Sequence, residues 1–319
     1  MNVAAPELDE AARATQPFAT GFDDAPTLDS RQLVIHSKQY RIVDTLGEGG
    51  MGTVYRAYDP VLERDVALKV MKPGLPDPAR RCFRAEALYG ARLCHPNLVR
   101  IFDLGIMPDL GLEWFAMEYL RGKDLERLLT GARRRGLRFS LNLVAQVFDG
   151  ILDALSHAHR QGIVHRDVKP ANIFVSRETH GTRVAAKLLD FGVACDVRRG
   201  GDDEIERCGD PRYVAPEQAL GGSRPDARTD VYAAGISLFE VVTGRHPFEE
   251  LLSEPTPDLI AAHCEREPPL PSNLLPRELS AAVRCGLDVV FSKACAKDPA
   301  ERFESAADMR RALLDVLPG

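Results

Sequence analysis

Three side chains within one short stretch of the sequence could together handle a metal-bound phosphate. The stretch reads Ile163-Val-His-Arg-Asp-Val-Lys-Pro-Ala-Asn172. Asp167 can accept a proton from an attacking hydroxyl. Lys169 can neutralise charge on a moving phosphoryl group, and Asn172 offers an oxygen of the kind that Mg²⁺ prefers. This spacing of a carboxylate, an ammonium and an amide suits the handling of a metal-bound phosphate, but such a cluster alone is a weak signal.

A glycine-rich segment earlier in the chain could hold the phosphates. Gly47, Gly49 and Gly52 fit the pattern G-x-G-x-x-G. A dinucleotide-binding turn with this pattern must open a helix, but the following Thr53-Val-Tyr55 favours a strand. We therefore expect a glycine-rich hairpin whose backbone amides can approach phosphates closely. The sequence contains no G-x-x-x-x-G-K-[ST], which excludes a Walker-type site.

Further charged residues fall on elements that the sequence predicts. Asp65-Val-Ala-Leu-Lys-Val70 alternates as a strand, which places Ala67 and Lys69 on one face. A lysine in an apolar strand usually reaches solvent at an edge. Glu86 lies in the middle of a predicted helix over residues 79–93 and is the natural counter-charge for Lys69; an exposed surface glutamate is the alternative. Asp190-Phe-Gly192 follows a short predicted strand and supplies another carboxylate.

Together and in this order, these motifs resemble the eukaryotic-like serine/threonine protein kinases of bacterial type. The resemblance covers roughly residues 38 to 316 and rests on the glycine-rich loop, V-A-L-K, the helical Glu86, H-R-D-V-K-P-A-N, D-F-G and A-P-E. The lysine two residues after Asp167 is typical of the serine/threonine branch rather than the tyrosine branch.

The resemblance implies an α+β, two-lobed protein kinase fold. The N-lobe would be a small antiparallel β-sheet with one helix, and the larger C-lobe would be mainly helical. The expected domain spans 38–318, divided into an N-lobe over 38–117, a hinge over 118–123 and a C-lobe over 124–318. Within the C-lobe, apolar residues recur at helical spacing over 142–160, and residues 230–244 are apolar on nearly every face. These patterns predict a helix that delivers the catalytic loop and a buried central helix.

The resemblance also implies a role for individual residues. Catalysis would fall to Asp167, Lys169 and Lys69, and the metal would be held by Asn172 and Asp190. Met117 would be the gatekeeper of the adenine pocket. Asp124 could bond the ribose or could instead cap the helix that begins near Leu125. The residues expected around ATP are Leu46, Gly47, Glu48, Gly49, Gly50, Met51, Gly52, Val54, Ala67, Lys69, Glu86, Met117, Glu118, Leu120, Asp124 and Phe174.

Other residues have implied roles in support of the site. Asp230 would brace the catalytic-loop backbone, Phe191 would pack beneath the N-lobe helix, and Arg302 would pair with Glu217 of the A-P-E triplet. His157, His159 and His165 resemble a metal cluster at first sight. No cysteine or further histidine lies at a zinc spacing, so we interpret these histidines as structural.

The activation segment departs from the family pattern. Residues 193–214 contain no serine and no threonine. Arg166 is typical of kinases whose loop is held by a phosphothreonine, and the corresponding position holds Glu206. A fixed carboxylate there could replace the phosphate, or the acidic loop could simply be solvated. Asp210 stands where the family has a threonine, close to Asp167.

Asp210 allows two alternatives. Two close carboxylates do not both ionise easily, so we expect the pKa of Asp167 or of Asp210 to rise. In the other alternative, Asp210 turns outward onto an arginine such as Arg207 or Arg212 and has no kinetic effect.

The resemblance implies transfer of the γ-phosphoryl group of Mg-ATP to serine and threonine hydroxyls of protein substrates, including autophosphorylation, in signalling. The cofactors would be ATP and Mg²⁺, with Mn²⁺ as an alternative ion. Two other functions compete with this one. A nucleotide-binding pseudokinase, or a weakly active kinase acting as a regulated scaffold, would normally have lost Lys69, Asp167 or Asp190. A small-molecule phosphotransferase would lack the A-P-E triplet and the long helices after it.

Composition limits the remaining classes of function. The 319 residues are 45% hydrophobic and 28% charged, as expected for a globular domain with a sizeable core. Of the net charge of −6, residues 1–30 carry five net negative charges, and they lie in a tail over residues 1–37 that we expect to be acidic and disordered. The nearly neutral remainder gives no support to nucleic-acid binding. No membrane span or signal peptide is apparent, so we expect a cytoplasmic protein with buried or half-buried reduced cysteines.

Overall fold

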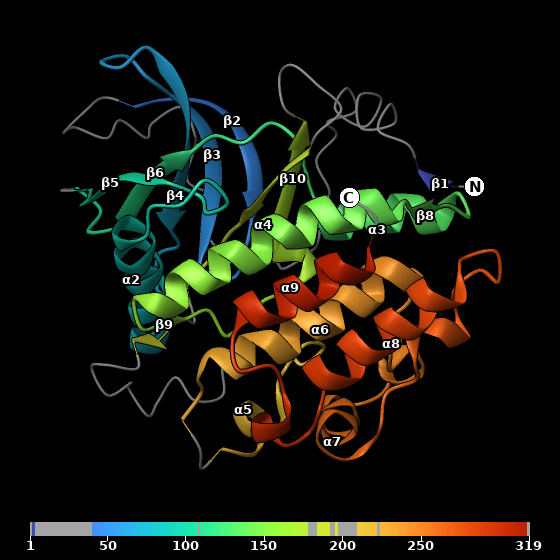
Figure 1. The fold of residues 1–319 in the computed structure, drawn as a ribbon. Helices are drawn as coiled ribbons and strands as arrows, with labels where there is room; N and C mark the ends of the chain where they lie inside the picture. The colour runs from blue at the N-terminus through green and yellow to red at the C-terminus, as the bar shows by residue number, and fades with distance from the viewer. Residues whose placement is uncertain are drawn as a thin grey trace.

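The computed structural model describes residues 2–3, 40–107, 109–177, 184–191, 195–196, 209–221 and 224–317. Figure 1 shows a smaller lobe built around a β-sheet and a larger lobe of packed helices. Most of the predicted tail lies outside the described residues. Its first residues form β1 (Asn2–Val3), which pairs in parallel with β8 (Arg138–Phe139) of the larger lobe. We had expected no regular structure there.

The N-lobe is a five-stranded antiparallel sheet in the order β2-β3-β4-β6-β5. Its strands are β2 (Arg41–Glu48), β3 (Gly52–Asp59), β4 (Arg64–Met71), β5 (Ile101–Ile106) and β6 (Glu113–Glu118). The alternation in β4 places Val66, Leu68 and Val70 in the core, with exposed fractions of 2% or less.

Helix α2 (Asp77–Arg92) packs on this sheet, which gives the N-lobe the single long helix that we expected. Pro78 lies in its first turn, where a missing N–H costs no helical hydrogen bond. The buried face carries Phe83 and Ala87, which belong to the same core cluster as the sheet residues. Glu86 lies on that buried face, so its charge must find a partner in the interior.

A small sheet joins the two lobes. It contains β7 (Lys123–Asp124), β10 (Ile173–Arg177) and β11 (Val184–Leu188) in the order β11-β10-β7. A Cβ added at Gly122 would collide with the carbonyl oxygen of Val175 on β10, so only glycine fits this close backbone approach. A second small pair joins β9 (Ile163–Val164) to β12 (Cys195–Asp196).

The C-lobe is mainly helical, and Figure 1 shows α4, α6, α8 and α9 packed side by side. Its helices are α3 (Leu125–Arg134), α4 (Leu141–Arg160), α5 (Pro216–Leu220), α6 (Ala227–Thr243), α7 (Thr256–Glu265), α8 (Ala281–Ala294) and α9 (Ala306–Val316). Short 3₁₀ segments are η1 (Pro170–Asn172), η3 (Glu249–Leu251), η4 (Pro271–Asn273) and η5 (Pro299–Glu301). This two-lobed α+β arrangement confirms the predicted fold class.

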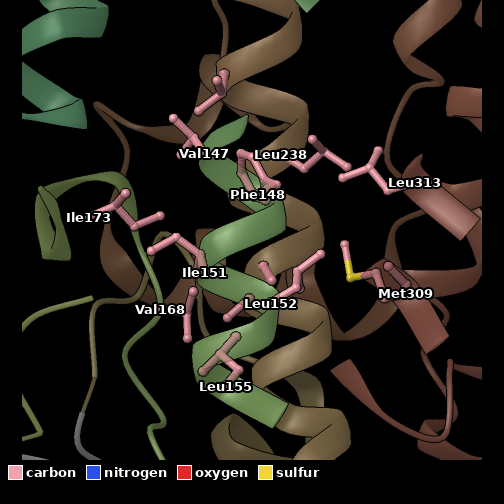
Figure 2. Close-up of a cluster of buried hydrophobic side chains, with 14 of the residues drawn as sticks. Val147, Phe148, Ile151, Leu152, Leu155, Val168, Ile173, Leu238, Met309 and Leu313 are labelled. Carbon is pink, nitrogen blue, oxygen red and sulfur yellow. The ribbon is translucent and has the colours of Figure 1, made fainter. Parts of the chain in front are cut away.

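Helix α4 forms the inner wall of the C-lobe core. Ser140 caps its start by accepting a hydrogen bond from the backbone N–H of Leu143. The apolar stripe Val147, Phe148, Ile151, Leu152 and Leu155 is exposed by 1% or less. Figure 2 shows these side chains beside Leu238 of α6, with Met309 and Leu313 of α9 close by. Burying one such side chain stabilises the fold by about 1.5–3 kcal/mol.

The same stripe also supports the catalytic loop. Val168 and Ile173 lie against the α4 side chains in Figure 2 and are fully buried. Because these two residues lie within and just after the segment that carries Asp167, Lys169 and Asn172, the helix fixes the backbone beneath the candidate catalytic groups.

Helix α6 is buried on every face between Thr229 and Thr243, as predicted. The Asp226 side chain caps its start by accepting from the N–H of Arg228, and the helix ends at Gly244 with φ 76°. Five cysteines are free, and two of these, Cys94 and Cys285, are exposed, which corrects our expectation for these two. In the described part of the chain, no helix combines the length and the apolar character needed to span a membrane.

Candidate active site

The buried Asp230 at the start of α6 holds the catalytic loop in place. Its Oδ2 accepts from the N–H of His165 at 2.8 Å and contacts His159 Nε2 at 2.7 Å, and its Oδ1 accepts from the N–H of Arg166 at 2.7 Å. Burial raises the pKa of Asp230, but the bonds from His159 and His165 outweigh this effect and hold the pKa below its usual value. The ionised carboxylate braces the loop, as the resemblance implied.

Arg166 adopts an unusual backbone conformation. Its φ is 68°, in the left-handed region that non-glycine residues rarely adopt. The N–H of Arg166 donates to the Asp230 carboxylate, and the Gln218 side chain donates to the carbonyl oxygen of Arg166 at 3.2 Å. The packed core of α6 and the following segment thus hold the turn on which Asp167 stands.

The three neighbouring histidines each contact protein groups. His165 Nε2 contacts the carbonyl oxygen of Leu189 at 2.9 Å, and its ring lies 4.7 Å from that of Phe191. His157 bonds to Gln161 at 2.9 Å. Within the described ranges, no group of three His, Cys, Asp or Glu side chains is placed to hold a metal ion.

The three groups of the catalytic loop lie within hydrogen-bonding reach of one another. Lys169 Nζ is 2.9 Å from Asp167 Oδ2. The side-chain amide of Asn172, in η1, donates to Asp167 O at 2.9 Å and to Asp167 Oδ2 at 3.0 Å. Both bonds use the amide nitrogen, so the amide oxygen of Asn172 is the atom that can serve a cation. Burial lowers the pKa of Lys169, but Asp167, Asp210 and Asp190 raise it above its usual value, so this lysine is charged.

Lys69 reaches across from β4 to α2. Its Nζ lies 2.8 Å from Glu86 Oε1 and 2.6 Å from Oε2. Only 13% of the Lys69 side chain and 8% of the Glu86 side chain are exposed, which excludes the solvent-exposed alternatives for both. Burial lowers the pKa of Lys69, yet Glu86 and Asp190 raise it above its usual value. Burial and the Asp190 carboxylate raise the pKa of Glu86 to about 7.

Asp190 stands between these two groups of residues. The negative charge of its carboxylate raises the pKa of Lys69, which lies in the N-lobe, and the pKa of Lys169, which lies in the catalytic loop. Its φ is 59°, a strained conformation of the kind that clusters at functional sites. Mg²⁺ takes oxygen ligands and is commonly held by one or two protein groups together with substrate phosphates. The Asp190 carboxylate and the Asn172 amide oxygen form a donor set of this kind, so the residues fit a divalent cation.

The glycine-rich segment is a hairpin between β2 and β3, and a strand rather than a helix follows it. This excludes the dinucleotide-binding alternative. The N–H of Gly49 donates to the carbonyl oxygen of Gly52 at 2.9 Å. A Cβ added at Gly52 would lie 2.5 Å from the carbonyl oxygen of Val70, so this position requires glycine for packing against β4. Leu46 lies at a register shift of β2 and is 39% exposed.

The predicted adenine-side residues lie on paired strands near the hinge. Met117 on β6 stands opposite Ala67 on β4, and Val54 on β3 stands opposite Lys69. The Glu118 side chain pairs with Lys187 of the small sheet at 2.9 Å. The contact of Glu118 and Leu120 with ATP stays a prediction.

Asp124 caps helix α3, which is one of the two roles that we considered for it. Its Oδ1 accepts from the N–H of Arg127 at 2.7 Å and caps α3. A role with ribose stays a prediction. Phe174 stands opposite Asp124 in the pairing of β10 with β7, which brings it to the same sheet.

Asp210 pairs with an arginine, but it does not turn outward. Arg212 Nη2 lies 2.7 Å from Asp210 Oδ2, and Lys169 Nζ lies 3.6 Å from the same oxygen. Burial raises the pKa of Asp210, but Arg212 and then Lys169 outweigh it, so the pKa lies below its usual value. We expected the pKa of Asp167 or of Asp210 to rise, and for Asp210 this expectation is wrong. Glu206 lies outside the described residues.

Glu126 is a residue of this region that the sequence reading missed. It lies on α3 and accepts from Arg212 Nη1 at 2.9 Å, although the two residues are 86 positions apart. We predicted Arg212 as one of two arginines that could meet Asp210, because it lies two residues away in the sequence. It held no signal for Glu126, because only the packing of α3 against the activation segment brings that carboxylate there.

Glu217 and Arg302 form the predicted pair, and both side chains are buried. Arg302 Nη1 lies 2.8 Å from Glu217 Oε1, and Nη2 lies 2.8 Å from Oε2. Thr229 of α6 donates to the same carboxylate at 2.8 Å, and Arg302 also donates to the carbonyl oxygens of Ala296, Arg228 and Lys297. This pair ties the end of the activation segment to the region before α9.

The chain is similar in sequence to known serine/threonine-protein kinases. Residues 40–310 match the protein kinase domain family. The chain is 36% identical over 286 residues to serine/threonine-protein kinase pkn3 of Myxococcus xanthus, covering 87% of this chain and 50% of that protein. It is 37% identical over 290 residues to serine/threonine-protein kinase PknB of Mycobacterium tuberculosis, covering 89% of this chain and 44% of that protein. The chain thus spans about half the length of the curated relatives it matches.

Solved structures agree with the fold. The crystal structure of the Mycobacterium tuberculosis PknI kinase domain superposes with a TM-score of 0.66 at 29% sequence identity. The superposition covers 86% of this chain and 95% of that domain.

Proposed function

The chain belongs to the protein kinase domain family, and from this premise we propose that it transfers the γ-phosphoryl group of ATP to serine and threonine hydroxyls of proteins. One observation carries the proposal. The charge of Asp190 raises the pKa of both Lys69 of the N-lobe and Lys169 of the catalytic loop, and Lys169 Nζ lies 2.9 Å from Asp167 Oδ2. In this proposal a base, a metal ligand and two cations would surround one site between the lobes.

The nucleotide would lie between the glycine-rich hairpin and the hinge. Lys69, held by Glu86, would bind the α- and β-phosphates, and open backbone at Gly47 and Gly50 leaves room for phosphates to approach. Asp190 and Asn172 would hold the metal, for which we propose Mg²⁺, with Mn²⁺ as an alternative. When bound, the metal neutralises charge on the β- and γ-phosphates.

Asp167 would orient the acceptor hydroxyl and take its proton as the hydroxyl oxygen bonds to the γ-phosphorus and the bond to ADP breaks. Lys169 remains charged and can stabilise the transferred oxygens. The protein contributes mainly position and charge, because phosphoryl transfer needs little covalent chemistry from side chains. Autophosphorylation, a role in signalling and a cytoplasmic location remain parts of the proposal.

Nothing in the described residues favours the scaffold alternative. A pseudokinase typically lacks one of Lys69, Asp167 and Asp190, and all three are present in this chain. The long helices after the A-P-E triplet, from α6 to α9, argue likewise against a small-molecule phosphotransferase.

The test is phosphate transfer from γ-labelled ATP to a generic protein acceptor, with phosphoamino-acid analysis of the product and Asp190→Ala as the control. We expect label on serine and threonine, and a large loss of transfer in Asp190→Ala. Wild-type transfer no higher than that of Asp190→Ala, with Mg-ADP still bound, would identify a nucleotide-binding scaffold and overturn the proposal.

A further inference from the structure

Asp210 brings a second carboxylate into contact with the candidate catalytic residues. Its backbone N–H donates to Asp167 Oδ1 at 3.1 Å, and its Oδ2 lies 3.6 Å from Lys169 Nζ. The side chains of Asp167, Asp210 and Lys169 are exposed by only 13%, 14% and 19%. Two carboxylates therefore share one ammonium in a mostly buried place.

Without a further cation, this arrangement would disfavour the proposed reaction. Like charges that are partly removed from water repel each other strongly, and the acceptor site must also receive the negative γ-phosphate. Asp210 would in addition compete with Asp167 and the phosphate for the single charge of Lys169.

Arg212 supplies the missing positive charge in a fixed geometry. Its Nε lies 3.0 Å and 3.2 Å from the two Asp210 oxygens, its Nη2 lies 2.7 Å from Oδ2, and its backbone N–H donates to Oδ1 at 3.0 Å. Such a two-pronged arginine–carboxylate pair is strong and directional. Both carboxylate oxygens of Asp210 are thereby turned toward Arg212 while its backbone N–H stays with Asp167.

Arg212 is itself anchored by residues of the C-lobe. Its Nη1 donates to Glu126 on α3 at 2.9 Å, and its guanidinium lies 5.5 Å from the ring centroid of Tyr213. Its carbonyl oxygen accepts from His246 Nε2 at 2.7 Å. The side chain therefore has little freedom to leave Asp210.

We propose that Arg212 is a positioning residue for the phosphoryl transfer: it neutralises Asp210 and so leaves Lys169 free to serve Asp167 and the phosphate. The aspartate and arginine together then replace the threonine expected at position 210. The inference deepens the proposed function and rests on it. It differs from a kinetically silent surface ion pair, because the two residues are expected to depend on each other in catalysis.

The decisive experiment measures the effect of Arg212→Ala in two backgrounds. In the wild-type background, we expect kcat to fall about 10-fold or more while KM for ATP changes less than about twofold. In the Asp210→Thr background, where no second carboxylate needs neutralising, the same change should alter kcat by less than about twofold. Arg212→Lys should retain part of the rate, because it keeps the charge and loses the two-pronged geometry.

Control variants separate this role from a structural one. Arg266→Ala removes an exposed arginine that pairs with Glu250 and should leave kcat unchanged. Mg-ADP affinity, measured by calorimetry, should be the same in all variants, since Arg212 is not placed in the nucleotide site. An equal loss of kcat from Arg212→Ala in both backgrounds, or no loss in either, would overturn the proposal.

A second measurement does not require turnover. The same four proteins form a double-mutant cycle in urea unfolding, in which charge compensation predicts that Arg212→Ala destabilises the wild-type background more than the Asp210→Thr background. Additive effects would exclude compensation even if the protein lacked transfer activity. Transfer activity absent from the wild type, with a clear coupling in this cycle, would instead refute the proposed function while supporting the pairing itself.

Discussion

The ammonium of Lys69 on β4 lies between the two carboxylate oxygens of Glu86 on α2, at 2.6 and 2.8 Å. Both side chains are mostly buried, and Asp190 acts on both of them. The pair therefore ties the position of the helix to the position of the cation that would meet the phosphates. A shift of α2 away from the sheet would leave Lys69 with Asp190 as its main counter-charge.

We predict that Lys69→Met lowers both ATP affinity and turnover, because the cation would bind phosphate in the ground state and in the transition state. We expect kcat/KM to fall by about 10²-fold or more, as for the loss of a key electrostatic contact. Glu86→Gln keeps the shape and removes the counter-charge, so its loss should be smaller, about 10-fold. Steady-state kinetics checks both, and a larger loss in Glu86→Gln than in Lys69→Met would contradict this order.

Asp167→Asn should lower kcat by about 10²–10⁴, the usual contribution of a general base, with little change in KM for ATP. The asparagine keeps the size of the side chain and can still contact Lys169. Asp149→Asn on the outer side of α4, where Asp149 pairs with Arg310, is the matched control and should be neutral. Unchanged turnover in both Asp167→Asn and Lys69→Met would rule out the kinase function.

We predict that the chain is active without phosphorylation of its activation segment, with Glu206 in place of a phosphothreonine. The activity should be modest, because a carboxylate carries one charge against about −1.5 to −2 for a phosphate. Glu206→Ala and Arg166→Ala should each lower the initial rate of protein whose lack of phosphate has been verified by intact mass. Glu204→Ala is the control. Wild-type rates in Glu206→Ala would favour a solvated acidic loop.

The Glu217–Arg302 pair should contribute strongly to stability. The exposed fraction is 0% for the Arg302 side chain and 8% for that of Glu217, so removing one partner leaves a buried charge. We expect Arg302→Met or Glu217→Gln to reduce the free energy of unfolding by about 3–5 kcal/mol in urea titrations. The double variant should lose less than the sum of the single losses. Fully additive losses would show that the two groups are not coupled.

His263 should make stability depend on pH. Burial, and then His246 and Lys297, lower its pKa to about 3 from the usual histidine value of about 6.5. Between these two values the unfolded chain binds a proton that the folded chain does not, so the free energy of unfolding falls as the pH drops below about 6.5. The slope from this group is at most about 1.4 kcal/mol per pH unit.

Comparing wild type with His263→Asn isolates this effect from other titrating groups. The asparagine can still meet the Tyr232 hydroxyl, which contacts His263 Nδ1 at 2.9 Å. We expect the loss of stability between pH 7 and pH 5 to be smaller in the variant than in the wild type, as measured by urea unfolding. Equal losses would show that His263 is not held neutral.

Local patterns in the sequence determined much of the fold and the site. The hydrophobic spacing of α4, the all-round apolar α6 and the glycine-rich hairpin each depend on neighbouring residues, so backbone periodicity and turn preferences fix them. Asp167, Lys169 and Asn172 meet for the same reason, because a short loop cannot separate them widely. The resemblance to a known family also predicted two pairs that are distant in the sequence, Lys69–Glu86 and Arg302–Glu217.

Only the tertiary structure decided which of several plausible partners a charged residue chose. Asp124 could serve a ligand or a helix, and it caps α3. The pKa of Asp210 could have risen because of the nearby Asp167, but Arg212 lowers it. That arginine in turn donates to Glu126, on a helix far away in the sequence. Cys94 and Cys285 are exposed although their residue type is usually buried. The reason is the same in each case: the energy of a side chain depends on which groups from distant segments surround it, and packing of the whole chain sets those groups.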